Sequence, residues 1–262
     1  MRVITFLSDF GNNSWYVSQM KGVALSLTNA TLVDITHEIS PHNIREGAYV
    51  LLCSVPYFPS GSVHVAVVDP GVGTNRRNIF ITTRSQILIG PDNGLLIPAA
   101  RFLGDFTVYE IADNSNHMQK TISNTFHGRD IYTPVAARIV NGLPFDAIGK
   151  KISDYVDLDF GSPVISDKCI TGRVMYIDRF GNIITNIPGF IFNKHVTYGN
   201  LVMTCFKSSS TEMRFVKSYG FVKPGEFLIT IGSGNYVEIS INQGNAARSL
   251  SVSVDDEIRL LF

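Results

Sequence analysis

The segment 67–77 brings an acidic side chain, a glycine-rich turn and an arginine pair into the run VVDPGVGTNRR. Asp69 follows an apolar run typical of a buried strand, and the two glycines allow backbone conformations with positive φ. Such a turn can fold over a ligand and bring an arginine back towards the aspartate. It lacks the spacing of phosphate-binding loops. Local chemistry leaves two interpretations open, a carboxylate–guanidinium site and a structural turn, and it does not distinguish Arg76 from Arg77.

A histidine lies in a second polar segment, TFHGRD (125–130), directly before a predicted helix. His127 is of the residue type best able to exchange protons near neutral pH. We expect Asp130 to cap the helix that begins at Ile131. A purely structural histidine is the alternative. No metal site is predicted, because metal-ligand spacing is absent from the other histidines, which are His37, His42, His64, His117 and His195.

A further aspartate, Asp9, ends the opening apolar run in the segment SDFG (8–11). Open α/β sheets bind ligands at the carboxyl ends of their strands, where Asp9 is expected. Its two oxygens could accept hydrogen bonds from both hydroxyls of a ribose. The alternative is a turn or helix cap, a common role for Asp before Gly.

Polar segments near the C-terminus could recognise a purine. They are DRFGN (178–182) and GSGNYVE (232–238), with Asn242 after them. Amides, hydroxyls and backbone groups suit the edge of a purine, and Phe180 could stack on its face. Each of these residues is also an ordinary turn residue.

The elements that must position these groups fall into two regions. Up to about residue 160, strands predicted at 2–8, 31–36, 62–68, 78–83 and 86–90 alternate with helices at 14–28, 44–55 and 131–141. This alternation predicts an α/β layer with a central, largely parallel sheet. The following strand-like runs, at 171–178, 200–206, 227–232, 236–242 and 257–262, predict an all-β barrel or sandwich. We therefore expect an N-terminal α/β domain over 1–162 and a C-terminal β-barrel domain over 163–262.

Composition favours a small-molecule partner. Of the 262 residues, 45% are hydrophobic and 17% charged, and the formal net charge is zero, so no basic surface for nucleic acid is expected. The cysteines Cys53, Cys169 and Cys205 stand far apart, which argues against disulfides and structural zinc. The N-terminus lacks the pattern of a secretory signal, and no run approaches the roughly 20 apolar residues that span a bilayer. We expect a cytoplasmic protein without membrane association.

Six ordered segments resemble one family. They are SDFG (8–11), VVDPGVGTNRR (67–77), PDNG (91–94), TFHGRD (125–130), DRFGN (178–182) and EISINQGNAA (238–247). Through these segments, the chain resembles the S-adenosylmethionine (SAM) hydroxide adenosyltransferases over nearly its whole length. This family is related to the SAM-dependent fluorinases and chlorinases.

The resemblance implies an N-terminal α/β domain, a C-terminal β-barrel, and a homotrimer whose sites lie between the N domain of one subunit and the C domain of its neighbour. It implies that Asp69, Arg76 and His127 form a hydrolytic triad, with Arg76 chosen over Arg77 by the family's spacing. It also implies that Asp9 holds the ribose. The resemblance further implies that Asn182, Ser233, Glu238 and the backbone near Ile241 hold the nucleoside. Phe180 and Asn242, identified above from local chemistry, complete the predicted substrate-binding set.

The expected reaction is hydrolysis of SAM to adenosine and L-methionine by attack of water at ribose C5′. SAM would be the substrate, and no cofactor is expected. Arg76 would stabilise the hydroxide form of the water, Asp69 would orient both, and His127 would accept or relay the proton. Two alternatives stay open: a SAM-dependent halogenase, and a binding module that senses SAM or adenosine without catalysis.

Overall fold

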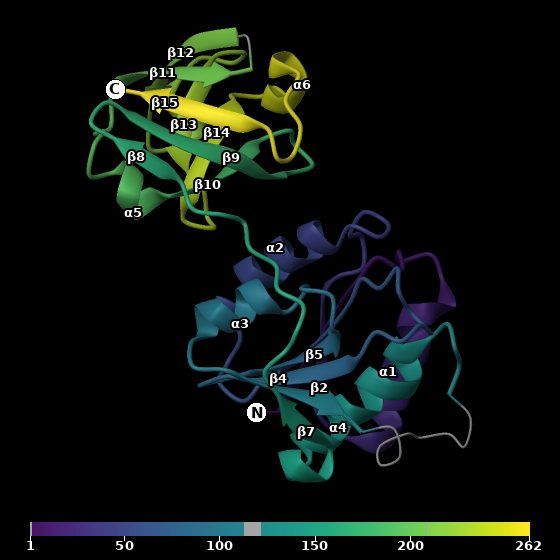
Figure 1. The fold of residues 1–262 in the computed structure, drawn as a ribbon. Coiled ribbons are helices and arrows are strands. Elements are labelled where there is room, and N and C mark those ends of the chain that lie inside the picture. The colour runs from purple at the N-terminus through teal and green to yellow at the C-terminus, as the bar shows by residue number, and fades with distance from the viewer. Residues whose placement is uncertain (1, 113–121, 208) are drawn as a thin grey trace. The chain divides into compact units, whose positions relative to one another are not determined.

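The computed structural model describes residues 2–112, 122–207 and 209–262. The chain divides into two compact units, Met1–Asp159 and Phe160–Phe262. Figure 1 shows a sheet with helices in the first unit and a strand-rich second unit. Within the described ranges, no helix is both long and apolar enough to cross a membrane.

The first unit is built on a seven-stranded sheet of order β2-β1-β3-β5-β4-β6-β7. The pairings β1–β2, β1–β3 and β3–β5 are parallel, and the pairings through β4, β6 and β7 are antiparallel. The predicted α/β class is confirmed, with a parallel region that ends at β5. The strands are β1 (Val3–Ser8), β2 (Thr31–Thr36), β3 (Val63–Val67), β4 (Asn78–Thr82), β5 (Ile87–Pro91), β6 (Thr107–Ile111) and β7 (Gly149–Ile152).

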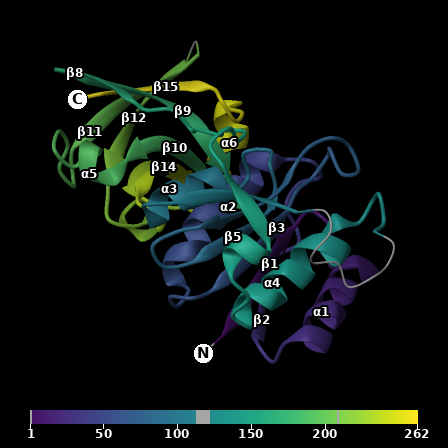
Figure 2. The same ribbon diagram turned by 60° about the horizontal axis from the view of Figure 1, so that its bottom comes forward.

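Helices cover both faces of this sheet. α1 (Trp15–Leu27) packs with α4 (Thr133–Val140) on one face, and α2 (Ile44–Ser54) packs with α3 (Ile97–Leu103) on the other, as Figures 1 and 2 show. Apolar side chains of α1 and α4 meet those of the central strands, for example Met20, Val135, Phe6 and Val65. Because β2 and β3 lie on opposite sides of β1, the sheet has a topological switch point there, where α/β proteins bind ligands.

The structure adds elements that the sequence pattern did not predict in this unit, namely α3, β6 and β7. It also changes the start of the helix expected over 131–141. A π-helical turn, η2 (Gly128–Tyr132), precedes α4. The prediction that Asp130 caps the helix is wrong, because its Oδ2 instead accepts the backbone N–H of Ser123 at 2.8 Å. Short 3₁₀ turns complete the set: η1 (Val55–Tyr57), η3 (Phe145–Ala147) and, in the second unit, η4 (Tyr219–Phe221).

The second unit is a closed β-barrel, which confirms the barrel expectation. Seven strands pair in the order β10-β14-β13-β12-β11-β15-β9, and β9 pairs back to β10. The interior is filled by buried side chains such as Ile170, Phe192, Phe215 and Ile239. The elements are β8 (Val164–Ser166), β9 (Cys169–Ile177), β10 (Ile183–Pro188), α5 (Gly189–Phe192), β11 (Leu201–Phe206), β12 (Ser209–Phe215), β13 (Phe227–Ile231), β14 (Tyr236–Ile241), α6 (Ala246–Leu250) and β15 (Glu257–Leu261).

Candidate active site

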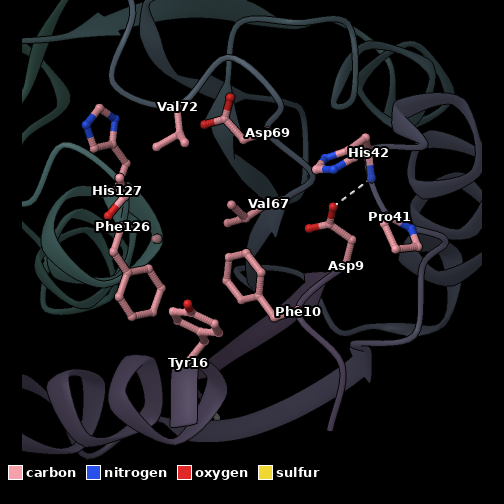
Figure 3. A pocket seen from close by; sticks show the side chains of 12 residues that line it. Asp9, Phe10, Tyr16, Pro41, His42, Val67, Asp69, Val72, Phe126 and His127 are labelled. Atoms are coloured by element: carbon pink, nitrogen blue, oxygen red, sulfur yellow. Dashed lines mark hydrogen bonds between the residues drawn. The ribbon is translucent and has the colours of Figure 1, made fainter. Parts of the chain in front are cut away.

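Two aspartates lie at the carboxyl ends of the adjacent parallel strands β1 and β3. Asp9 directly follows β1, and Asp69 comes two residues after β3. Both border a cavity of about 300 Å³ at this edge of the sheet, shown in Figure 3. The cavity is lined by Asp9, Phe10, Tyr16, Pro41, His42, Val67, Asp69, Val72, Thr125, Phe126, His127 and Gly128.

Asp69 forms a two-point ion pair with Arg76. Nε of Arg76 donates to Oδ1 of Asp69 at 2.9 Å, and Nη2 donates to Oδ2. The side chain of Arg76 is only 11% exposed and that of Asp69 only 5%. Parallel N–H···O bonds of this kind fix both the distance and the orientation of the two groups. The turn after Asp69 therefore does return an arginine to the aspartate.

His127 joins this pair through the same guanidinium. Its Nδ1 lies 2.8 Å from Nη2 of Arg76. A guanidinium can only donate, so Nδ1 accepts this bond and the neutral ring carries its proton on Nε2. The structure thus brings Asp69, Arg76 and His127 into one hydrogen-bonded cluster, with Asp69 and His127 on the cavity wall.

A glycine explains how two loops far apart in sequence meet here. Gly73 has φ +75°, and a Cβ at this position would lie 2.2 Å from the carbonyl oxygen of Asn124. Only glycine lets the turn after Asp69 approach the loop that carries His127 so closely. Asp130 fixes the other end of that loop through its bond to Ser123.

The structure separates the two neighbouring arginines. Arg77 points away from the cluster: its Nε donates to Oδ2 of Asp92 at 2.9 Å, and its Nη1 lies 3.1 Å from Oδ2 of Asp154. Asp92 also accepts the backbone N–H of Val156. Arg77 therefore ties the segment around 154–156 to the sheet, and Arg76 alone of the pair faces Asp69 and His127.

Arg76 lies behind the cavity wall, with all five N–H donors engaged. Besides its three bonds to Asp69 and His127, its Nη1 donates to Oδ1 of Asn78 at 2.5 Å and to the carbonyl oxygen of Arg77 at 3.4 Å. Among the described residues that line the cavity, Arg76 does not occur. The cation is thus placed to act through Asp69 and His127.

Asn78 and Tyr132 complete the cluster and were not identified from the sequence. The Tyr132 hydroxyl donates to Oδ1 of Asn78 at 2.8 Å. The Arg76 guanidinium carbon lies 5.8 Å from the centre of the Tyr132 ring. Burial, opposed by the nearby Arg76 charge, raises the pKa of the Tyr132 hydroxyl well above its ordinary value. Position 78 directly follows the arginine pair, but nothing in the sequence links it to Tyr132.

Three aromatic rings form one end of the cavity, and the sequence analysis did not identify them as a group. The ring centres of Phe10, Tyr16 and Phe126 are 5.1 to 5.7 Å apart. Figure 3 shows these rings at one end of the cavity and Asp69 with His127 at the other. The cavity therefore offers an apolar end and a charged end.

Asp9 has a structural contact as well as a place on the cavity wall. Its Oδ2 accepts the backbone N–H of His42 at 2.9 Å, drawn as a dashed line in Figure 3. His42 has φ +65°, which this hydrogen bond helps to stabilise. Asp9 therefore stabilises a distant turn at His42, while its carboxylate stays on the wall of the cavity.

A second cavity, of about 480 Å³, lies in the C-terminal unit. It is lined by Asp178, Phe180, Asn182, Tyr219, Ile241, Asn242, Gln243 and Gly244. Asp178 shapes the turn here, because its carboxylate accepts the backbone N–H groups of Phe180 and Asn182 and the Asn182 amide. The Phe180 ring is 69% exposed. Four of the predicted nucleoside-binding residues thus share one cavity wall.

The other two predicted residues of this unit take different places. Glu238 is buried, and its Oε1 accepts the hydroxyls of Tyr219 and Ser240 at 2.7 and 2.8 Å. It reaches the cavity through Tyr219, whose hydroxyl pKa is raised by burial and by Glu238. Ser233 is exposed in the turn between β13 and β14, and the described lining of the cavity does not contain it.

Metal-binding geometry is absent from the described part of the chain. No group of three or more His, Cys, Asp or Glu side chains among those residues is placed to hold an ion. His117 lies outside the described residues. The expectation that no metal or cofactor takes part stays a prediction.

Comparison with known proteins gives whole-chain similarity. Models of the SAM hydroxide adenosyltransferase N-terminal and C-terminal domains match residues 4–149 and 172–259. An (R)-S-adenosyl-L-methionine hydrolase of Methanocaldococcus jannaschii is 40% identical, across 99% of this chain and 96% of that protein. A fluorinase of Actinoplanes is 28% identical across 71% of each chain. The crystal structure of an uncharacterized conserved protein from Thermotoga maritima superposes with a TM-score of 0.94 at 37% identity, covering 99% of this chain and all of that one.

Proposed function

Because the chain belongs to the SAM hydroxide adenosyltransferase family, we propose that it hydrolyses SAM to adenosine and L-methionine by attack of water at ribose C5′. The observation that carries the proposal is the cluster of Asp69, Arg76 and His127 at the charged end of the cavity. The name of the archaeal relative specifies the (R) configuration, so we propose the (R) sulfonium epimer as the preferred substrate.

The substrate supplies its own leaving group. Its positively charged sulfur departs as the neutral thioether of methionine when the C5′–S bond breaks, so no acid is required at sulfur. The difficult partner is water, whose pKa of about 15.7 makes it a poor nucleophile. The protein must therefore hold one water in line with the C5′–S bond and provide an acceptor for its proton.

Asp69 and His127 can hold such a water between them. Each Asp69 oxygen accepts one bond from Arg76 and keeps a second lone pair, which can accept a water proton. The His127 ring, with Nδ1 engaged by Arg76, has Nε2–H as its donor to the water oxygen. As the C5′–O bond forms, the surplus proton passes to Asp69 and then to solvent.

This arrangement revises the roles expected from the sequence. His127 was expected to accept or relay the proton, but its Nδ1 is occupied and its Nε2 already carries a proton. We therefore assign proton acceptance to Asp69 and orientation of the water to His127. Arg76 becomes a positioning residue that orders both side chains.

The nucleoside would be held by Asp9 at the ribose hydroxyls, and by Phe180, Asn182, Ile241 and Asn242 at the adenine. Glu238 would contribute through Tyr219. Ser233 belongs to the proposal only through the family pattern. The homotrimer with shared sites and the cytoplasmic location are likewise carried over as predictions. Chains with Asp69→Asn and chains with Asn182→Ala, co-expressed and assayed at SAM concentrations far below KM, would regain activity in mixed trimers only if two subunits build each site.

The halogenase alternative is disfavoured by the Asp69 carboxylate. Its oxygens on the cavity wall can only accept hydrogen bonds, so they offer no donor to a halide placed where the water is proposed. A sensor without catalysis would need the nucleoside-binding residues alone, so the hydrogen-bonded cluster of Asp69, Arg76 and His127 favours catalysis.

The test is product analysis with each sulfonium epimer, in buffer without halide and in high chloride. We expect adenosine and methionine in both buffers, faster from the (R) epimer, and no 5′-chloro-5′-deoxyadenosine. Chlorinated product would favour the halogenase, and intact SAM bound to the folded protein would favour the sensor.

A further inference from the structure

The amide of Asn78 is the meeting point of three side chains around the proposed catalytic cluster. Its Oδ1 accepts from Nη1 of Arg76 at 2.5 Å and from the Tyr132 hydroxyl at 2.8 Å, and lies 3.3 Å from Nδ1 of His127. An amide oxygen can only accept, so the hydroxyl of Tyr132 must donate to it. The shared acceptor links the arginine and the tyrosine.

The π-helical turn explains why Tyr132 can reach this acceptor. In an α-helix of 3.6 residues per turn, the residue five positions after His127 would point to a different side. In η2 the backbone closes five residues apart, with the N–H of Thr133 bonded to the carbonyl of Gly128. Tyr132 and His127 are therefore brought to the same side of the turn. Tyr132 is hydrogen-bonded to Asn78, and His127 is hydrogen-bonded to Arg76.

Groups shielded from solvent need hydrogen-bond partners within the protein. Tyr132 has no exposed surface, and Arg76 packs over its ring. The buried Tyr132 hydroxyl and the partly buried Arg76 guanidinium lose solvation, which protein partners must replace. Asn78 is the observed partner of both, so its oxygen must face them and its amide orientation is fixed.

We propose that Asn78 and Tyr132 are positioning residues that set the tautomer of His127 through Arg76. The inference rests on the proposed hydrolysis for its kinetic consequence, and on geometry alone for the tautomer. Tyr132 fixes the Asn78 amide with its oxygen towards Nη1. This holds the guanidinium plane so that Nη2 donates to Nδ1 of His127 and the ring proton stays on Nε2. With that plane released, Nδ1 loses its donor and the ring can carry its proton on either nitrogen.

Two substitutions separate this role from a general structural one. Asn78→Ala removes the acceptor, and Tyr132→Phe removes only the hydroxyl. Tyr109→Phe is the matched control, because Tyr109 is also a buried tyrosine of this unit but stacks on Phe80 away from the cluster.

The measurement is the ¹⁵N NMR signature of the His127 ring in the ligand-free protein, at a pH where the ring is neutral. We expect a single Nε2–H tautomer in the wild type and in Tyr109→Phe, and a mixture of tautomers in Asn78→Ala and Tyr132→Phe. For SAM hydrolysis we expect kcat to fall about 10²-fold in Asn78→Ala and about tenfold in Tyr132→Phe, with KM little changed.

An unchanged Nε2–H signature in both Asn78→Ala and Tyr132→Phe would overturn the inference. If Asn78→Ala does not fold, Tyr132→Phe decides alone, because it deletes a single oxygen. The proposed function can fail separately: a wild-type protein with the predicted tautomer and no adenosine release would contradict hydrolysis and leave the positioning role standing.

Discussion

The two cavities that carry the predicted site residues differ in how their polar side chains are held. In the N-terminal unit, Asp69 and His127 are held by a partly buried arginine whose donors are all engaged. In the C-terminal unit, the wall is made largely of amides, backbone turns and an exposed phenylalanine ring. Interlocked charges suit a reaction, because they are ordered before the substrate arrives. Neutral donors, acceptors and a ring suit recognition of a purine. Variants in the first cavity should therefore change turnover, and variants in the second should change binding.

The largest expected effect is that of Asp69→Asn. It removes the charge that orders Arg76 and the acceptor for the water proton, so we expect kcat to fall about 10³-fold, a loss of about 4 kcal/mol. Binding of SAM, measured by calorimetry, should stay within about threefold. Turnover near the wild-type rate would contradict the assignment of the reaction to the first cavity.

Acid should destabilise the N-terminal unit before the barrel. His64 in β3 is fully buried, bonded to Thr5 and Gln86, and burial lowers its pKa from 6.5 to about 4. Between these pH values the unfolded chain binds a proton that the folded chain does not, so stability falls as pH drops from about 6.5 to about 4. The shift corresponds to about 3 kcal/mol.

Urea unfolding at pH 7 and pH 4.5, followed by amide exchange in each unit, measures this effect. His64→Gln should flatten the pH dependence of the N-terminal unit. A barrel that loses stability first would contradict the assignment to His64.

The neighbouring arginines offer a matched pair. Arg76→Lys removes a two-point bond that an ammonium cannot reproduce, and we expect kcat to fall about 10²-fold. Arg77→Lys weakens the ties to Asp92 and Asp154, so it should lower the free energy of unfolding by about 1 kcal/mol with kcat within about threefold. Steady-state kinetics and thermal melts of both proteins check this. Equal kinetic losses would mean that Arg77 also serves the reaction.

The smallest effect is expected in the second cavity. Phe180→Ala should raise the Kd for adenosine about tenfold by removing a stacking surface, and should leave kcat within about threefold. Fluorescence titration with adenosine measures the first quantity. A large fall in kcat at saturating substrate would show that this ring takes part in more than binding.

The two aspartates that follow strands β1 and β3 were the part of the site that the sequence predicted best. The apolar runs before Asp9 and Asp69 gave the positions of β1 and β3, and parallel pairing then places both carboxylates at one edge of the sheet. The link from Asp69 to His127 came from family resemblance, because the two are separated by 57 residues of chain between positions 70 and 126. Their contact depends on the close approach of Gly73 to Asn124.

The sequence did not predict the features of the site that depend on side-chain direction or on irregular backbone. Arg76 and Arg77 are separated by the distant partners Asp92 and Asp154. Tyr132 reaches Asn78 only because a π turn replaces the first turn of the expected helix. The barrel strands β10 and β12 were missed for a different reason, since their sequences, IITNIP and SSTEMRF, break the alternation of apolar and polar residues.

Hydrolysis of SAM in ¹⁸O-labelled water, with the products analysed by mass spectrometry, tests most directly whether a water held at Asp69 attacks C5′. We expect adenosine with ¹⁸O at its 5′ hydroxyl, unlabelled methionine, and loss of the labelled product in Asp69→Asn. Adenosine without the label, or labelled adenosine formed equally well by Asp69→Asn, would contradict attack at C5′ by a water held at Asp69.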